Sequence, residues 1–121
     1  MTDQELYEAA VAASAGAYAP YSKFLVGAAA LMRDGRVVTG VNVENAAYPL
    51  GVCAERTALA RAVAEGYGPG DVEAIGITAS PCGGCRQWLV EFRVGRVTYA
   101  NNDGVVVTTT PEELLPDTFA F

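Results

Sequence analysis

The stretches Cys53-Ala54-Glu55-Arg56 and Pro81-Cys82-Gly83-Gly84-Cys85-Arg86 hold all three cysteines of a chain that has no histidine. Three thiolates suit a tetrahedral zinc ion, and a protein that supplies only three ligands leaves the fourth position open to a reactive water. Glu55 follows the first cysteine by two residues, so its carboxylate is placed to move the protons of that water. We therefore expect one zinc ion per chain, held by Cys53, Cys82 and Cys85, with Glu55 as general acid and base.

Both stretches stand where a helix is predicted to begin, one over residues 53–65 and the other over residues 84–92. The positive end of each helix dipole would then face the sulfurs and lower the pKa of the thiols. Three thiolates around a divalent ion carry one excess negative charge, which weakens the acidity of a bound water. We expect the helix dipoles and the neighbouring Arg56 and Arg86 to compensate this excess.

Two simpler interpretations of the cysteines remain open. Free cysteine is among the most buried residue types, so each thiol taken alone could be ordinary core. The ion could also be purely structural, provided that an Asp or Glu closed the fourth position, because the chain offers no further Cys or His. The joint pattern of Cys-x-Glu and Pro-Cys-x-x-Cys favours the open, reactive site over both.

The chain on either side of these stretches predicts a sheet with helices. Thr2-x-x-Glu5 is a capping box before a helical apolar pattern, and Thr110-Pro111 begins a short helix near the end. Asp34-Gly35 and residues 101–104 are turn signals, each between two strand-like runs. The predicted strands cover residues 24–32, 36–41, 74–78, 94–100 and 105–109, and the last two should form a hairpin because their connection is too short for a crossover helix.

This element order predicts an α/β fold, a three-layer α/β/α sandwich around a mixed five-stranded sheet. The 121 residues, of which 51% are hydrophobic, suit a single domain over residues 1–121 with one core. The polar segment 42–51 is a good place for a binding loop.

Charge and cysteine usage limit the partners and the compartment. The net charge of −6 would repel a phosphate backbone, so we expect no nucleic acid and a small neutral or cationic substrate instead. An odd number of thiols, together with an opening Met1–Glu5 that lacks a basic and apolar leader, favours the cytoplasm over secretion. The apolar run over residues 24–32 is too short for a membrane helix, so we expect no membrane partner.

Several motifs together resemble one known family, the small homotetrameric cytidine deaminases that act on free nucleosides. The matching blocks are Tyr18–Ser22, Asn42–Tyr48, Cys53–Ala58, Pro81–Gln87 and Leu114–Phe119. The resemblance therefore extends over nearly the whole chain, and it implies the cytidine deaminase-like form of the sandwich.

The resemblance also implies roles for individual residues. Asn42 and Glu44 would bind the ribose 3′-hydroxyl, Phe24 would lie against the base, and the backbone of Ala54 would meet the pyrimidine carbonyl. Read without the resemblance, Asn42 and Glu44 alternate along a strand end and so face the same way, although a polar loop rim explains them equally well. Phe24 alone would more often be a core residue.

A second group of residues is implied to act across a subunit boundary. Ala46, Tyr48 and Phe119 would reach the pocket of a neighbouring subunit, so that a homotetramer completes each active site. Exposed aromatic residues such as a near-terminal Phe119 often anchor a partner.

These inferences predict hydrolytic deamination of cytidine and 2′-deoxycytidine to uridine and 2′-deoxyuridine, with release of ammonia, in pyrimidine salvage. Within enzymes, the alternative is a deaminase for a related aminopyrimidine nucleoside such as blasticidin S, and the pair Asn42-x-Glu44 favours cytidine. Editing of RNA or DNA fits the acidic chain less well. From another class, the chain could be a nonenzymatic zinc-stabilised binding module.

Overall fold

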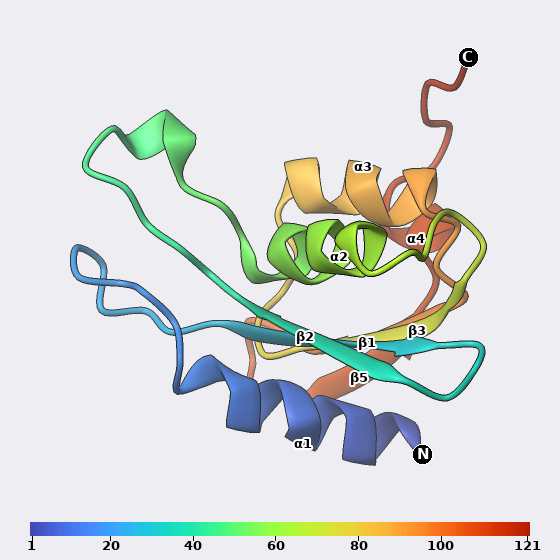
Figure 1. Ribbon diagram of the computed structural model, residues 1–121, viewed down its shortest axis with the longest axis horizontal. Helices are drawn as coiled ribbons and strands as arrows, with labels where there is room; N and C mark the ends of the chain where they lie inside the picture. The colour runs from blue at the N-terminus through green and yellow to red at the C-terminus, as the bar shows by residue number, and fades with distance from the viewer.

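The computed structural model describes all residues from Met1 to Phe121. One five-stranded sheet with the order β2-β1-β3-β4-β5 lies between helices on its two faces (Figure 1). The elements are α1 (Asp3–Ser14), β1 (Gly27–Met32), β2 (Val37–Val41), the 3-10 helix η1 (Tyr48–Leu50), α2 (Ala54–Ala64), β3 (Val72–Ile77), α3 (Gly83–Glu91), β4 (Arg96–Ala100), β5 (Val106–Thr109) and α4 (Pro111–Leu114). The predicted three-layer sandwich is confirmed.

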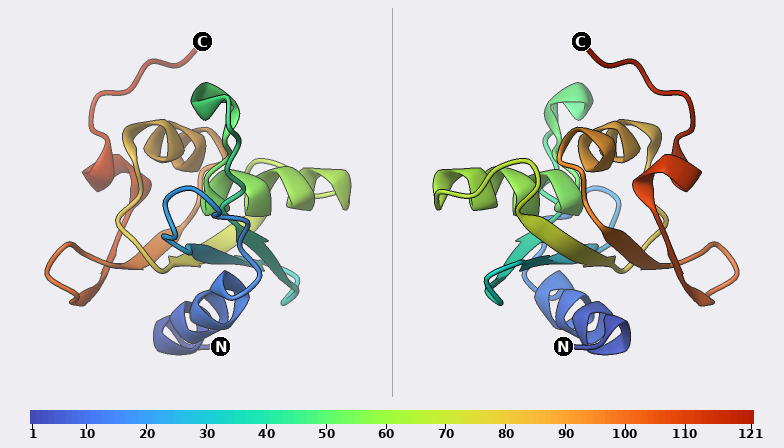
Figure 2. Two further views of the ribbon diagram at one scale, coloured as in Figure 1. Left: turned by 90° about the vertical axis from the view of Figure 1, so that its left-hand side faces the viewer. Right: turned by 90° about the vertical axis from the view of Figure 1, so that its right-hand side faces the viewer.

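The sheet is mixed, as expected. β1 pairs antiparallel with β2 and β3, β3 pairs parallel with β4 across the α3 crossover, and β4 forms the predicted hairpin with β5. Figure 2 shows α1 alone on one side of the sheet and the other three helices on the opposite side. No helix of this chain has both the length and the apolar character needed to cross a membrane.

Helix ends follow the capping chemistry that the sequence predicts. Thr2 and Glu5 form a reciprocal capping box at the start of α1, with hydrogen bonds of 2.7 and 3.1 Å. Thr110 caps α4 by accepting from the Glu113 amide, and Pro111 occupies the first position of that helix. These local bonds satisfy amide groups that a helix otherwise leaves without partners.

The predicted strand over residues 24–32 is too long at its start. β1 begins only at Gly27: the Phe24 carbonyl and the Val26 amide bond to the side chain of Asn42, and only the Val26 carbonyl still accepts from the backbone, at the Asn42 amide. Other bounds shift by one or two residues: β3 begins at Val72, β4 begins at Arg96, and Cys53 caps α2 instead of being its first residue. Segment 18–26 is therefore a loop beside the protruding segment 42–52 (Figure 1).

Very small residues let the helices approach the sheet closely. A Cβ atom at Gly27 or Gly76 would lie 2.0 or 2.8 Å from backbone oxygens of α1. On the other face, a Cβ atom at Gly40 would lie 2.4 Å from the Ala58 amide nitrogen of α2. The main core fills this second face, between the sheet and the helices α2 and α3. The position of α2, whose first turn carries Cys53 and Glu55, is therefore set by its contact with β2.

Candidate active site

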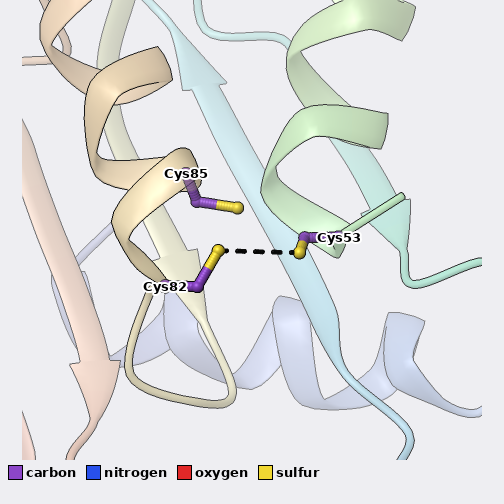
Figure 3. A group of neighbouring side chains, drawn as sticks. All are labelled: Cys53, Cys82 and Cys85. Atoms are coloured by element: carbon purple, nitrogen blue, oxygen red, sulfur yellow. Dashed lines mark hydrogen bonds between the residues drawn. The ribbon is translucent and has the colours of Figure 1, made fainter. Parts of the chain in front are cut away.

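The three cysteines meet where α2 and α3 begin. Cys53 is the N-cap of α2, Cys82 is the N-cap of α3, and Cys85 lies in the first turn of α3. Figure 3 shows the three sulfurs converging in the space between the two helix starts. All three Sγ atoms lie within 4.8 Å of one another, and those of Cys53 and Cys82 are 3.8 Å apart.

These distances fit a zinc ion. Tetrahedral zinc with Zn–S bonds of about 2.3 Å separates its sulfur ligands by about 3.8 Å. The group consists of the three cysteines alone, so three side chains would hold the ion. No fourth Cys, His, Asp or Glu joins this group, as a purely structural zinc would require.

Both helix starts favour negatively charged sulfur. Neither Cys53 nor Cys82 makes a side-chain capping bond, so the side chains at these N-cap positions do not satisfy the first-turn amide groups. Unsatisfied amides at a helix start carry partial positive charge, which stabilises a thiolate. The predicted placement of the cysteines at helix starts is thus confirmed.

Arg56 provides the direct positive charge at the cluster. Its Nη2 atom donates to the Cys53 sulfur at 3.5 Å, and its Nε atom is buried without a partner. Hydrogen bonding with Cys85 and with Arg56 lowers the pKa of Cys53 to about 5, despite partial burial. The hydrogen bond with Cys53, together with burial, raises the pKa of the Cys85 thiol.

Arg86, by contrast, does not contact the sulfurs. Its guanidinium donates to the carbonyl oxygens of Pro81 at 2.9 Å and Leu114 at 3.0 Å, and to the Ser80 hydroxyl at 3.4 Å. Arg86 therefore does not compensate the negative charge of the sulfurs through a direct contact, contrary to our expectation from the sequence. Its side chain instead fastens the loop before Cys82 to the C-terminal helix α4.

Glu55 is buried beside the cluster, with only 3% of its surface exposed. Burial raises the pKa of Glu55 to about 7, and the nearby Cys53 adds to the increase. A carboxyl group that titrates near neutral pH accepts and donates protons with similar ease. This is the property that the sequence pattern requires of a general acid and base.

A cleft of about 730 Å³ opens above the cluster. It is lined by 21 residues, and these include most of the predicted site: Phe24, Asn42, Glu44, Ala46, Tyr48, Cys53, Ala54, Glu55, Arg56 and Cys82. Cys85 is fully buried behind the others. The cleft is large enough for a small organic molecule, whose pockets usually span 300–1,000 Å³ or so.

Comparison with known proteins decides which family this site represents. Residues 1–101 match the model of the cytidine and deoxycytidylate deaminase zinc-binding region. The chain belongs to this family. It is 46% identical to the cytidine deaminase of Halalkalibacterium halodurans, over 98% of this chain and 95% of that protein.

Solved structures of other deaminases have the same fold. The crystal structure of cytidine deaminase from Burkholderia pseudomallei superposes with a TM-score of 0.92 at 48% identity, covering 98% of this chain and all of that one. Cytidine deaminase from Mycobacterium tuberculosis gives a TM-score of 0.85 at 39% identity, covering 100% and 99% of the two chains. The predicted cytidine deaminase-like sandwich is therefore confirmed.

Asn42 and Glu44 make contacts in this deaminase that the sequence did not predict. Both side chains bind the backbone of the loop that carries Phe24: Asn42 contacts Phe24 and Val26, and Glu44 contacts Tyr21 and Ser22. Sequence reasoning missed Ser22 as part of this site. The only available signal was its place within the Tyr18–Ser22 block, which says nothing of a contact with Glu44, 22 residues away.

Phe119 lies away from the cleft of its own chain. Its side chain is 73% exposed and stacks edge to face with Phe121, with ring centroids 5.1 Å apart. Tyr48, on the protruding η1 segment, is 91% exposed although it lines the cleft rim. A single chain therefore leaves both aromatic residues largely uncovered.

Proposed function

We propose that this family member catalyses the hydrolytic deamination of cytidine and 2′-deoxycytidine to uridine and 2′-deoxyuridine, with release of ammonia. The observation that carries the proposal is the juxtaposition, under one cleft, of three converging sulfurs and a buried glutamate with a pKa near neutrality. The reaction fits the salvage of pyrimidine nucleosides in the cytoplasm.

Cys53, Cys82 and Cys85 would hold one zinc ion. When bound, zinc supplies a water acidic enough to lose a proton near neutral pH. Arg56 offsets the excess negative charge of three thiolates through its contact with Cys53. The chain thus provides both the ligands and the charge balance that this chemistry needs.

Glu55 would carry the protons of the reaction. It accepts a proton from the attacking water and delivers it to ring nitrogen 3, while a bond forms between that water's oxygen and carbon 4. It then takes the proton of the new hydroxyl on carbon 4 and passes it to the 4-amino group, so that the carbon 4 carbonyl forms, the bond from carbon 4 to nitrogen breaks and ammonia leaves. A carboxyl with a pKa of about 7 suits both directions of transfer.

The rim of the cleft would hold the nucleoside. Phe24 would lie against the base and the Ala54 backbone would meet the pyrimidine carbonyl, while Asn42 and Glu44 would bind the ribose 3′-hydroxyl. Asn42 uses one amide hydrogen for the Phe24 carbonyl and retains the other. A hydroxyl that accepts from Asn42 and donates to Glu44 would satisfy both side chains.

Assembly would complete the site. Ala46, Tyr48 and Phe119 would reach a neighbouring subunit's cleft in a homotetramer. The support is the extent of exposed apolar side chain around the cleft and at the C-terminus, including Tyr21, Phe24, Tyr48, Leu50, Phe119 and Phe121. Exposed apolar surface of this kind marks interaction sites in soluble domains. Light scattering on the eluting protein would give its mass and test the assembly.

One experiment separates this function from its alternatives. Metal analysis of the purified protein is combined with an ultraviolet assay on cytidine, and blasticidin S serves as the competing substrate. We expect one zinc per chain and conversion of cytidine to uridine. A zinc-loaded protein that leaves cytidine unchanged, and unfolds when the metal is chelated, would be a binding module instead.

A further inference from the structure

The loop over residues 21–26 is held at the cleft rim by two side chains from segment 42–44. Glu44 Oε1 accepts from the amides of Tyr21 at 3.0 Å and Ser22 at 3.1 Å, and Glu44 Oε2 accepts from the Ser22 hydroxyl. Asn42 donates to the Phe24 carbonyl at 2.9 Å and accepts from the Val26 amide at 2.8 Å. The backbone of the loop is thereby tied to the proposed sugar-binding pair.

Ser22 connects the two halves of this arrangement. Its hydroxyl donates to Glu44 Oε2, and its Oγ accepts from the Phe24 amide at 3.0 Å. A single hydroxyl therefore bridges the carboxylate proposed to bind the sugar and the backbone of the residue proposed to lie against the base. No other side chain of the loop donates a hydrogen bond to Glu44.

The residue between Ser22 and Phe24 is in an unfavourable conformation. Lys23 has φ of 61°, in the left-handed region that residues with a Cβ atom rarely adopt. Such a conformation persists only where the surroundings determine it, and it gathers at functional sites. Here the residues on both sides of Lys23 are fixed: Ser22 by bonds to Glu44, and Phe24 by bonds to Ser22 Oγ and Asn42. These bonds hold Lys23 in a conformation that it would not adopt by itself.

The carboxylate of Glu44 has little freedom left. A carboxylate offers about four hydrogen-bond positions, and the loop occupies three of them. The bonds from Ser22 and Tyr21 also lower the pKa of Glu44, which keeps the group charged. The remaining position is on Oε2, where the Ser22 hydroxyl is the one loop partner, so this bond, added to the two amide bonds on Oε1, sets the direction of the free lone pair.

We infer that Ser22 is a positioning residue, whose hydroxyl orients the Glu44 carboxylate toward the 3′-hydroxyl of the nucleoside. The inference rests on the proposed function, because it assumes that Glu44 meets the sugar. Ser22 itself need not contact the substrate. Its loss should weaken recognition of the 3′-hydroxyl more than it weakens the chemical step.

The test compares Ser22→Ala with wild type on two substrates, 2′-deoxycytidine and 2′,3′-dideoxycytidine, which lacks the 3′-hydroxyl. We expect kcat/KM for deoxycytidine to fall by about tenfold or more, mainly through KM, as for loss of a binding contact. For dideoxycytidine we expect a change below about twofold. Ser22→Thr, which keeps a hydroxyl, should restore most of the loss.

The matched control is Ser14→Ala, which removes a serine hydroxyl bonded only to the Val11 carbonyl on α1, on the far side of the sheet. It should leave both substrates unaffected. A second measurement places Ser22→Ala in a Glu44→Gln background, where it should add less than about twofold, because both changes disrupt the same contact.

The outcomes distinguish failure of the inference about Ser22 from failure of the proposed deaminase function. Equal losses on both substrates would mean that Ser22 merely stabilises the loop, and no loss would mean that it does nothing; either overturns the inference while cytidine deamination stands. A wild-type protein inactive on cytidine and deoxycytidine would overturn the function and the inference together. Ser22 is exposed, so its replacement leaves the core intact.

Discussion

Replacing Gly40 by alanine adds one methyl group to the contact between β2 and α2. The new Cβ atom would lie 2.4 Å from the Ala58 nitrogen, 2.6 Å from the Ala54 oxygen and 2.8 Å from the Ala58 Cα. All three are backbone atoms of a helix, so no side chain can rotate away to make room. The helix itself must move.

The size of the effect follows from these distances. Ordinary contacts of a Cβ atom begin at 3.4 Å, so α2 would have to shift by about 1 Å. Overpacking of this kind lowers the free energy of unfolding by about 1–3 kcal/mol. With an unfolding entropy of about 2.1 cal/mol/K per residue, 121 residues translate this into a melting temperature lower by about 4–12 °C.

The same shift should reach the active site. Cys53 caps α2 and Glu55 lies in its first turn, so both would move relative to Cys82 and Cys85 on α3. A displacement of 1 Å at a reacting group lowers a rate by about 10²-fold. We therefore expect Gly40→Ala to lose turnover as well as stability, with weaker retention of zinc.

The assay is thermal unfolding by circular dichroism at fixed protein and zinc concentrations, with zinc content and ammonia release measured on the same samples. The control is Gly68→Ala, because an added Cβ there meets nothing within 4 Å and its φ is not in the left-handed region. That variant should stay within about 0.5 kcal/mol of wild type. If Gly40→Ala has the same melting temperature as the control and retains its turnover, the close contact between α2 and β2 does not determine the geometry of the active site.

Three further predictions concern the site itself. Glu55→Gln should keep zinc and still bind nucleoside but lose at least about 10²-fold in turnover. The control Glu8→Gln, on the exposed face of α1, should turn over as fast as wild type. Near-normal turnover of Glu55→Gln would contradict the proton-transfer role. Removing zinc with a chelator should abolish ammonia release and adding zinc should restore it, so steady activity in metal-free protein would exclude the zinc site. Arg86→Ala should lower the free energy of unfolding by about 1–3 kcal/mol, because it leaves two partly buried carbonyl groups unpaired. Arg93→Ala, which removes one exposed bond, is the control in urea unfolding.

The sequence predicted well those elements whose cause lies within a few residues. The capping box at Thr2, the turn at Gly35 with φ of 95° and the turn at Gly104 with φ of 79° each depend on one local conformation. The zinc cluster was predictable for another reason: each of its two cysteine motifs marks a helix start, and zinc chemistry then requires the two starts to meet.

What the sequence could not predict depends on contacts between distant residues. The start of β1 was misplaced because the Asn42 side chain forms hydrogen bonds with the backbone of Phe24 and Val26. The hydrophobic pattern of the sequence does not reveal these bonds. Arg86 was paired with the sulfurs because it is their neighbour in sequence, yet its partner Leu114 lies 28 residues away. Proximity along the chain is a poor guide for long side chains, which reach whichever carbonyl the fold brings near.

Glu55 illustrates why the site can be recognised against the rest of the fold. Besides Thr98, it is the only polar or charged side chain in the buried set. Thr98 pairs its hydroxyl with that of Thr108 at 2.8 Å and so fits its surroundings. Burial instead penalises the charge of Glu55 and raises its pKa to about 7. Burying a carboxyl group costs stability that an apolar residue would not cost, and groups with pKa values perturbed in this way gather at functional sites, which supports the proton-transfer role proposed for Glu55.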